Sequence, residues 1–247
     1  MAVTAAPTRR ERQRAATQAE IDATARALLD REGPAGVTVA AVAREMDMTA
    51  PALYRYVASR ADLLTRLITA GYDEVADRLA RARDSAPVDD PGARTVAVAT
   101  AWREWCLAET SMFALLYGSP LAGYQAPEDG PTTPAARRVG QAFWSVMLEA
   151  SRRGQLGEPL VDDLTAPVEQ MTADWYAMKA LPEGLGPRQV QAGFIAFALL
   201  VGCMTVEALG HMPPMQPDQA REAYLVKVAT TLRITGVPWP RSGPLAR

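Results

Sequence analysis

The sequence predicts an all-α protein with a three-helix N-terminal domain and a larger helical C-terminal domain. Apolar residues recur at helical spacing along the chain, and alternating runs of β-branched residues are rare. The 247 residues are enough for one or two domains with a substantial core. The stretch 85–92 contains Pro87 and Pro91 and interrupts the helical pattern, so we place the domain boundary there.

The N-terminal domain is expected to start with a helix over residues 17–31. Its apolar stripe contains Ile21, Ala25 and Leu28, and Gly33 followed by Pro34 acts as a stop signal. Four arginines precede this helix, at positions 9, 10, 12 and 14, so we expect residues 1–15 to form a basic arm. The expected domains are therefore residues 1–15, 16–84 and 85–247.

Two short helices and a long one complete the N-terminal domain. The second helix is expected over residues 39–46 with Thr38 as its N-cap, and the third over residues 50–56 with Thr49 as its N-cap. The residues between them must turn sharply, and Asp47 can adopt the left-handed conformation that the turn needs. A fourth helix begins at Ser59, where Ser59 and Asp62 have the form of a capping box.

The C-terminal domain is expected to contain six helices. Their spans are residues 93–109, 112–117, 135–153, 161–180, 187–209 and 217–235. Residues 118–134 are rich in glycine and proline and are expected to form a loop. Such a length is unusual in a compact domain, so the loop is either functional or simply mobile.

Charge is distributed unevenly along the chain. The net charge is −2, but residues 1–83 carry 13 arginines and 11 acidic residues, and the remainder has an excess of acidic residues. A mildly basic end on an acidic body is typical of a DNA-reading domain joined to a domain with another task. A basic unstructured tail would have the same composition.

Residues 38–57 have the spacing of a helix-turn-helix. The second of its helices would enter the major groove of DNA with its N-terminus first. Small residues at the start of that helix let the backbone approach base edges, and Tyr54, Arg55 and Tyr56 can reach flanking phosphates. Any small three-helix domain can show this spacing, so periodicity alone leaves DNA binding and plain helical packing as alternatives.

The sequence TVAAVAREMDMTAPALYRYVASRADLL, residues 38–64, resembles the signature of the tetracycline-repressor (TetR/AcrR) family of bacterial regulators. Thr38 and the Leu53–Tyr54 pair are among the matching positions. The chain departs from the family pattern at Asp47, where glycine is usual, at Tyr56, where histidine is common, and at Arg60, where lysine is common.

The resemblance implies a transcriptional regulator that binds a double-stranded DNA operator. It implies that Thr38 and Arg60 contact phosphates and that Tyr54 and Tyr56 contact the DNA backbone. The alternatives are that Tyr54 belongs to the core and that Arg60 is a solvated charge. The full set of expected DNA-binding residues is Thr38, Thr49, Ala50, Pro51, Tyr54, Arg55, Tyr56 and Arg60.

The resemblance also implies a homodimer held by the last two helices. The helix expected over residues 187–209 is apolar on two faces, so it needs one partner from its own core and one from outside. The last helix carries a further apolar stripe, and a purely intramolecular core is the alternative. The expected interface residues are Phe194, Phe197, Val201, Met204, Leu225, Val228 and Leu232.

Aromatic residues are concentrated in the C-terminal domain, which holds all five tryptophans. Aromatic and methionine side chains at helical spacing usually form a core, and the more specific hypothesis is a pocket for a small apolar effector. With the resemblance, this predicts a repressor that the effector releases from its operator. Activation, and an architectural DNA-binding dimer without effector, stay open. The expected pocket residues are Trp102, Trp105, Phe113, Tyr117, Phe143, Trp144, Trp175 and Met178.

The sequence gives no support to other classes of function. It contains no zinc-protease pair, phosphate-binding loop, nucleophile elbow or dinucleotide motif, so we expect neither an enzyme nor a cofactor. Cys106 and Cys203 are far apart and His211 is the sole histidine, so we expect no metal site and a reducing cytoplasm. The uncharged run 189–206 is interpreted as a buried helix and not as a membrane span.

Overall fold

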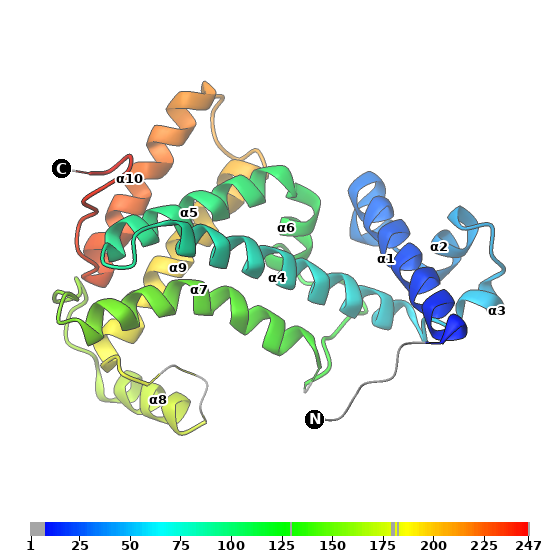
Figure 1. Ribbon diagram of the computed structural model, residues 1–247, viewed down its shortest axis with the longest axis horizontal. Helices are drawn as coiled ribbons and strands as arrows, with labels where there is room; N and C mark the ends of the chain where they lie inside the picture. The colour runs from blue at the N-terminus through cyan, green and yellow to red at the C-terminus, as the bar shows by residue number, and fades with distance from the viewer. Residues whose placement is uncertain (1–7, 129, 179–180, 182, 247) are drawn as a thin grey trace. The chain divides into compact units, whose positions relative to one another are not determined.

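Ten α-helices and no strand make up the regular structure of the described residues (Figure 1). The structure is a computed structural model, and it describes residues 8–128, 130–178, 181 and 183–246. The predicted all-α class is confirmed. The helices fall into two compact units, which we call the head (residues up to Gly71, with Ser111–Pro134) and the body (Tyr72–Thr110, with the residues from Ala135 onward).

The head is built from short helices around one apolar core. Its helices are α1 (Arg9–Gly36), α2 (Val39–Glu45), α3 (Ala50–Leu53), the first part of α4 (Arg60–Ser85) and most of α6 (Thr110–Tyr117). Side chains without exposed surface fill the centre, among them Ile21, Leu28, Leu53, Val57 and Leu64.

The division between the units lies inside α4 and not after residue 84, where the sequence had placed it. α6 and the loop that follows it pack on the first part of α4. Gly71 has no side chain, and the Met112 side chain occupies the space beside it. Further along the loop, the hydroxyl oxygens of Thr65 and Tyr124 lie 3.0 Å apart. These contacts join part of the expected C-terminal domain to the head.

α1 begins at Arg9, which corrects the predicted arm over residues 1–15. Residues 1–7 lie outside the described part of the chain, and the rest of the expected arm is helical. Thr8 caps this helix: its hydroxyl accepts from the Glu11 amide at 3.3 Å, and its amide donates to the Glu11 carboxylate at 2.6 Å. Gly33, with a φ of 69°, interrupts the helical geometry just before Pro34, where the stop signal was expected.

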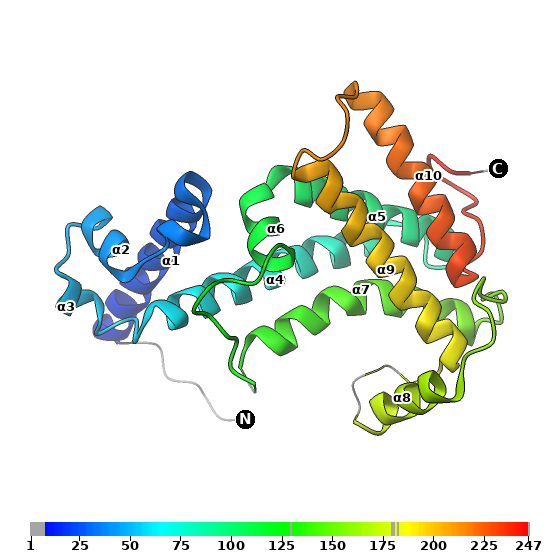
Figure 2. The ribbon, with the colours of Figure 1, turned by 180° about the vertical axis from the view of Figure 1, so that it is seen from behind.

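The turn between α2 and α3 has the predicted left-handed residue. Asp47 has a φ of 51° and is the only non-glycine residue with a positive φ among those that the structure describes. The amide of Met48 donates to the Ala43 carbonyl at 2.8 Å and closes the turn. α3 is shorter than expected and ends at Leu53 (Figure 2). Tyr54–Tyr56 form a turn, in which the Tyr56 amide donates to the Leu53 carbonyl at 2.8 Å.

The body is a bundle of longer helices. They are the rest of α4, α5 (Pro91–Ala108), α7 (Thr132–Arg152), α8 (Ala166–Ala177), α9 (Pro187–Ala208) and α10 (Pro217–Thr235). α9 packs against α5, α8 and α10, and Figure 2 shows α10, in orange, beside it. Of the described helices, α9 alone is long and apolar enough to cross a membrane, a criterion that core helices of soluble proteins also meet.

α8 begins at Ala166, whereas the sequence predicted a helix from residue 161. The residues before it are non-helical and are hydrogen-bonded to partners elsewhere in the body. The amide of Leu160 donates to the Ile234 carbonyl at 3.0 Å, and the Arg188 side chain donates to the Val161 carbonyl at 2.6 Å. These long-range bonds replace the local ones that a helix would need.

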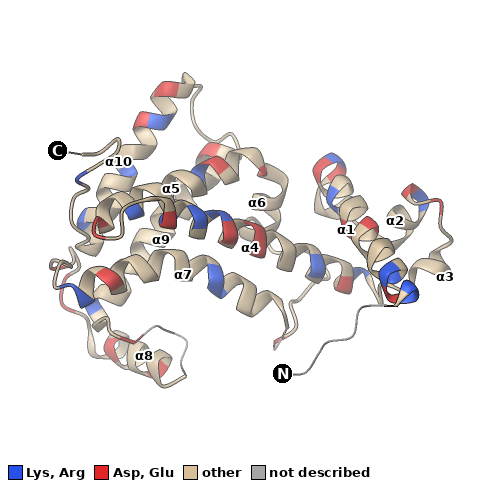
Figure 3. Cartoon of the chain, viewed as in Figure 1, with Lys and Arg blue, Asp and Glu red and all other residues tan. Residues whose placement is uncertain are grey.

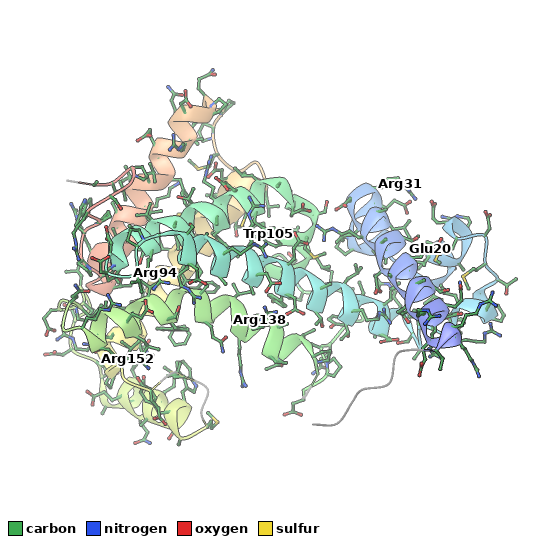
Figure 4. The ribbon with its side chains drawn as sticks, viewed as in Figure 1. Glu20, Arg31, Arg94, Trp105, Arg138 and Arg152 are labelled. Carbon is green, nitrogen blue, oxygen red and sulfur yellow. The ribbon has the colours of Figure 1, made fainter. Side chains whose placement is uncertain are left out.

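Two arginines of α5, one buried and one half-buried, link the helices of the body. Arg94 of α5 donates to the Arg83 carbonyl at 3.2 Å, forms an ion pair with Asp84 of α4 at 2.9 Å and a second with Glu149 of α7 (Figure 4). Arg103, also on α5, pairs with Glu207 of α9, and both side chains are largely buried. α4, α5, α7 and α9 are therefore fixed to one another by charge as well as by apolar packing.

Candidate functional site

The exposed face of the helix-turn-helix carries most of the predicted DNA-binding residues. Leu53 and Val57 are fully buried and anchor α3 in the head. Between and before them, Thr49, Pro51 and Arg55 are exposed and Ala50 is half-buried. Tyr54 is 54% exposed, so the alternative that it belongs to the core is excluded.

Thr38 and Thr49 each cap a helix with the hydroxyl oxygen. The Thr38 oxygen accepts from the Ala41 amide at 3.0 Å, and the Thr49 oxygen accepts from the Ala52 amide at 3.4 Å. Each threonine keeps its O–H hydrogen for another acceptor, because the cap uses only a lone pair. A phosphate oxygen is such an acceptor, so the cap geometry is compatible with the phosphate role that the resemblance implies.

Arg60 differs from the other expected DNA-binding residues because its side chain is already engaged. Its Nε donates to the Val37 carbonyl and its Nη2 to the Pro34 carbonyl, each at 2.9 Å. These bonds tie the start of α4 to the connection between α1 and α2. The alternative of a freely solvated charge is therefore excluded, and a phosphate contact by Arg60 stays a prediction.

A basic depression adjoins the residues that follow α3. Figure 3 shows the basic residues in the first turns of α1 in blue. Its lining comes from the first turns of α1 and from the two residues Arg55 and Tyr56. The Arg14 guanidinium lies over the Tyr56 ring, 5.8 Å from its centroid. The sequence alone predicted that the arginines at the start of α1 belong to a basic arm. The Thr8-x-x-Glu11 capping-box pattern indicates instead that a helix starts there. The α1 residues of this depression are Arg9, Arg10, Gln13 and Arg14.

The body contains an apolar cavity of about 160 Å³ between α5, α7, α9 and α10. None of its lining residues is charged. Phe143, Trp144, Phe194 and Phe197 supply aromatic walls, and the Trp144 and Phe194 rings meet edge to face at 5.4 Å. α9 can approach Trp144 closely because Gly193 has no Cβ: an added one would lie 2.3 Å from the indole ring.

Three threonines give the cavity its polar character. The hydroxyls of Thr95, Thr231 and Thr235 donate to carbonyls of their own helices, at 3.0, 2.7 and 2.8 Å. Each oxygen retains acceptor capacity because its proton is already used. The cavity therefore favours a neutral molecule that can donate a hydrogen bond.

Only two of the predicted pocket residues line this cavity, Phe143 and Trp144. The other placements are corrected by the structure. Trp102 and Trp105 are fully buried core residues that stack at 5.9 Å, and Met178 is 65% exposed. Trp175 packs edge to face on Phe194 behind the cavity wall. Phe113 and Tyr117 stack on each other in the head and belong to a different unit.

The predicted interface residues mostly face inward. Met204, Leu225, Val228 and Leu232 are each at most 4% exposed, so their stripes are explained by the intramolecular core, which corrects the prediction. Phe194 and Phe197 line the cavity, and Val201 is half-buried. The exposed apolar positions of α9 and α10 lie elsewhere, and they include Ile195, Ala198, Gly202 and Val226.

Family models match both parts of the chain. Bacterial regulatory proteins of the tetR family match residues 21–67, and the tetracyclin repressor-like C-terminal domain matches residues 95–230. HTH-type transcriptional regulators from Mycobacterium bovis and Mycobacterium tuberculosis are each 37% identical to this chain over 187 residues, which cover 75% of it and 77% of each relative.

Solved structures agree with the family models. The regulatory protein SCO4313 has a TM-score of 0.67 at 26% identity, covering 91% of this chain and 99% of that one. RolR in complex with the ligand resorcinol has a TM-score of 0.51 at 15% identity, covering 93% and 97%, and shares the fold. The chain belongs to the tetR family of bacterial regulatory proteins and is a DNA-binding transcriptional regulator, not an enzyme.

Proposed function

We propose that this regulator is a cytoplasmic homodimeric repressor, and that a small neutral molecule releases it from its operator by binding in the body cavity. The observation that carries this proposal is the uncharged, aromatic-walled cavity with its three threonines. Family membership supports operator binding, and the cavity supports the choice of effector.

The size of the cavity favours a ligand with a single ring. Its volume of about 160 Å³ is close to that of an engineered apolar cavity of about 150 Å³ that stays dry and binds benzene. A carboxylate or an amine would enter without a charged partner, because no lining residue is charged, and that desolvation is costly. RolR, which shares the fold, has been crystallised with resorcinol.

The cavity is linked to α4 by direct bonds. Thr95 lines the cavity, and its neighbour Arg94 binds the Arg83 carbonyl and the Asp84 carboxylate at the end of α4. A ligand that shifts α5 would therefore act on α4, and α4 has residues in the head as well as in the body. Release requires that the ligand prefer the conformation that does not fit the operator.

We place the dimer contact on the outward face of α9 and α10. Ile195 is 46% exposed and Val226 66% exposed, and Ala198 and Gly202 leave room for a second helix to approach. Charged residues at Ile195 and Val226 should yield monomers with an intact fold. If the double variant Ile195→Glu/Val226→Glu still sedimented as a dimer, the dimer contact would have to lie on another surface.

The effector hypothesis is tested with a library of single-ring compounds against an operator recovered by selection from random DNA. All tryptophans lie in the body, so intrinsic fluorescence reports ligand binding there and not DNA binding by the head. We expect neutral phenols to quench or shift the emission and to dissociate the operator complex at the same concentrations. Benzoates of the same shape should do neither.

A cavity-filling variant provides the matched control. Ala196 lines the cavity and is 7% exposed, so Ala196→Leu should abolish ligand binding and leave operator binding intact. Ala173→Leu, at an exposed position of α8, should change neither property. If Ala196→Leu still responded to the compounds, the effector would bind at another place. If no compound acted, an architectural DNA-binding dimer would become the better account.

A further inference from the structure

We propose that the N-terminal extension of α1 forms a second phosphate-binding surface on the head, continuous with the end of α3. It consists of Arg9, Arg10 and Arg14 together with Arg55 and Tyr56. Its ligand is the DNA backbone beside the bases that α3 faces. The inference needs DNA binding by the head and is independent of the effector proposal.

The surface is part of a folded helix and not of a tail. α1 starts at Arg9, and the reciprocal bonds between Thr8 and Glu11 fix its first turn. Arg10 and Arg14 are four residues apart and therefore lie on one side of the helix. A helix holds these guanidinium groups in place before DNA arrives, which lowers the entropy lost on binding.

Arg14 and Tyr56 join the start of α1 to the residues that follow α3. The guanidinium of Arg14 lies over the Tyr56 ring at 5.8 Å, and both residues line the depression that Arg55 also borders. The start of α1 is thereby placed beside the residues that immediately follow α3. A phosphate bound here would flank the bases read from Thr49–Pro51.

The charges of this surface are available for an anion. Among the described residues, no ion pair joins Arg9, Arg10, Arg14 or Arg55 to a carboxylate, whereas Arg66 is paired with Asp22 elsewhere in the head. Glu11 is the nearest acid in sequence, and its carboxylate is held by Thr8. A cluster of guanidinium groups without acidic partners suits phosphate oxygens.

The N-terminal part of α1 lies outside the matched family segment. The tetR family match begins at residue 21, so Arg9, Arg10 and Arg14 precede it. Phosphate contacts carry no base information, so the surface should add affinity and fix the register of the head without changing sequence preference.

The test compares full-length variants on a labelled 30-base-pair duplex of mixed sequence and on the selected operator, across a range of NaCl concentrations. The slope of log affinity against log salt concentration should become shallower by about 0.9 for each phosphate contact that the triple variant Arg9→Gln/Arg10→Gln/Arg14→Gln removes. At 0.1 M salt, each lost contact should lower the affinity about eightfold. The affinities for the operator and for the mixed-sequence duplex should fall by the same factor. The triple Arg→Lys variant should retain the slope because it retains the charge.

A matched control removes the same charge from the body. Arg152→Gln/Arg153→Gln/Arg221→Gln changes three exposed arginines that form no ion pair with another described residue, and it should leave the slope unchanged. Circular dichroism checks α1, and single variants at Arg10 and Arg14 should each lose a fraction of the slope if the triple variant unfolds. An unchanged slope in the α1 variants, or an equal loss in the body control, would overturn the proposal.

Discussion

Arg94 is the residue whose replacement should destabilise the body most clearly. Its side chain is only 7% exposed and binds one carbonyl and two carboxylates, from α4 and α7. Arg94→Met keeps the apolar stem of the side chain and removes the guanidinium. The variant therefore isolates the effect of the charge network from that of packing.

The expected magnitude follows from the exposure of the partners. Removing one member of a buried ion pair costs about 3–5 kcal/mol. Asp84 is 56% exposed and Glu149 32% exposed, so water solvates the carboxylates that are left, and we expect about 2–3 kcal/mol. For a protein of this size, that loss lowers the melting temperature by about 4–12 °C.

Tryptophan fluorescence during urea unfolding is the appropriate assay because the tryptophans all lie in the body. Arg138→Met is the control: Arg138 pairs with Asp73 and Asp77, but it is 44% exposed, so its loss should cost about 0–1 kcal/mol. If the stability of Arg94→Met lay within about 0.5 kcal/mol of the wild type, the usual range of a surface substitution, this reasoning would be refuted.

Three further predictions concern single positions. Asp47→Val should destabilise the head by about 1–2 kcal/mol, because a β-branched residue resists the left-handed conformation, and Asp47→Gly should not; thermal unfolding followed by circular dichroism distinguishes them. Gly193→Ala should displace the Trp144 ring, cost about 1–3 kcal/mol and shift the tryptophan emission; an unaltered spectrum would contradict the close packing. Hydrogen bonding from Arg83 lowers the pKa of Asp84, so its stabilisation is present above the ordinary value of 3.8 and is lost as the pH falls below it. In Asp84→Asn, the free energy of unfolding should fall less steeply as the pH is lowered. If urea titrations at acidic pH gave the same pH dependence for the variant and the wild type, Asp84 would make no such contribution.

The parts of the fold that were predicted correctly depend on local chemistry. Thr38 and Thr49 cap their helices, and Asp47 turns the chain, because the bonds involved span only a few residues. Tertiary contacts decided the errors. The start of α1 has charged residues and no apolar stripe, so hydrophobic periodicity could not detect it. α8 begins later than predicted because the residues before it are hydrogen-bonded to residues distant in sequence.

The candidate sites show the same limit. The pattern of aromatic residues predicted that the body would contain a pocket, but it did not show which side of each helix would face it. Phe143 and Trp144 line the cavity as expected, while Trp102 packs in the core. Phe194 and Phe197 had been expected to contact a second subunit and instead line the cavity. Periodicity identifies an apolar stripe, and only the packing of neighbouring helices determines what covers it.

The most direct test of the account is a closed thermodynamic cycle for one effective phenol. Its dissociation constant is measured by tryptophan fluorescence for the free protein and for the protein saturated with operator, and operator affinity is measured with and without the phenol. We expect the phenol to bind the free protein about 100-fold more tightly than the operator-bound protein, and to weaken operator binding by the same factor. Equal affinity of the phenol for free and operator-bound protein would contradict the claim that the body cavity controls DNA binding.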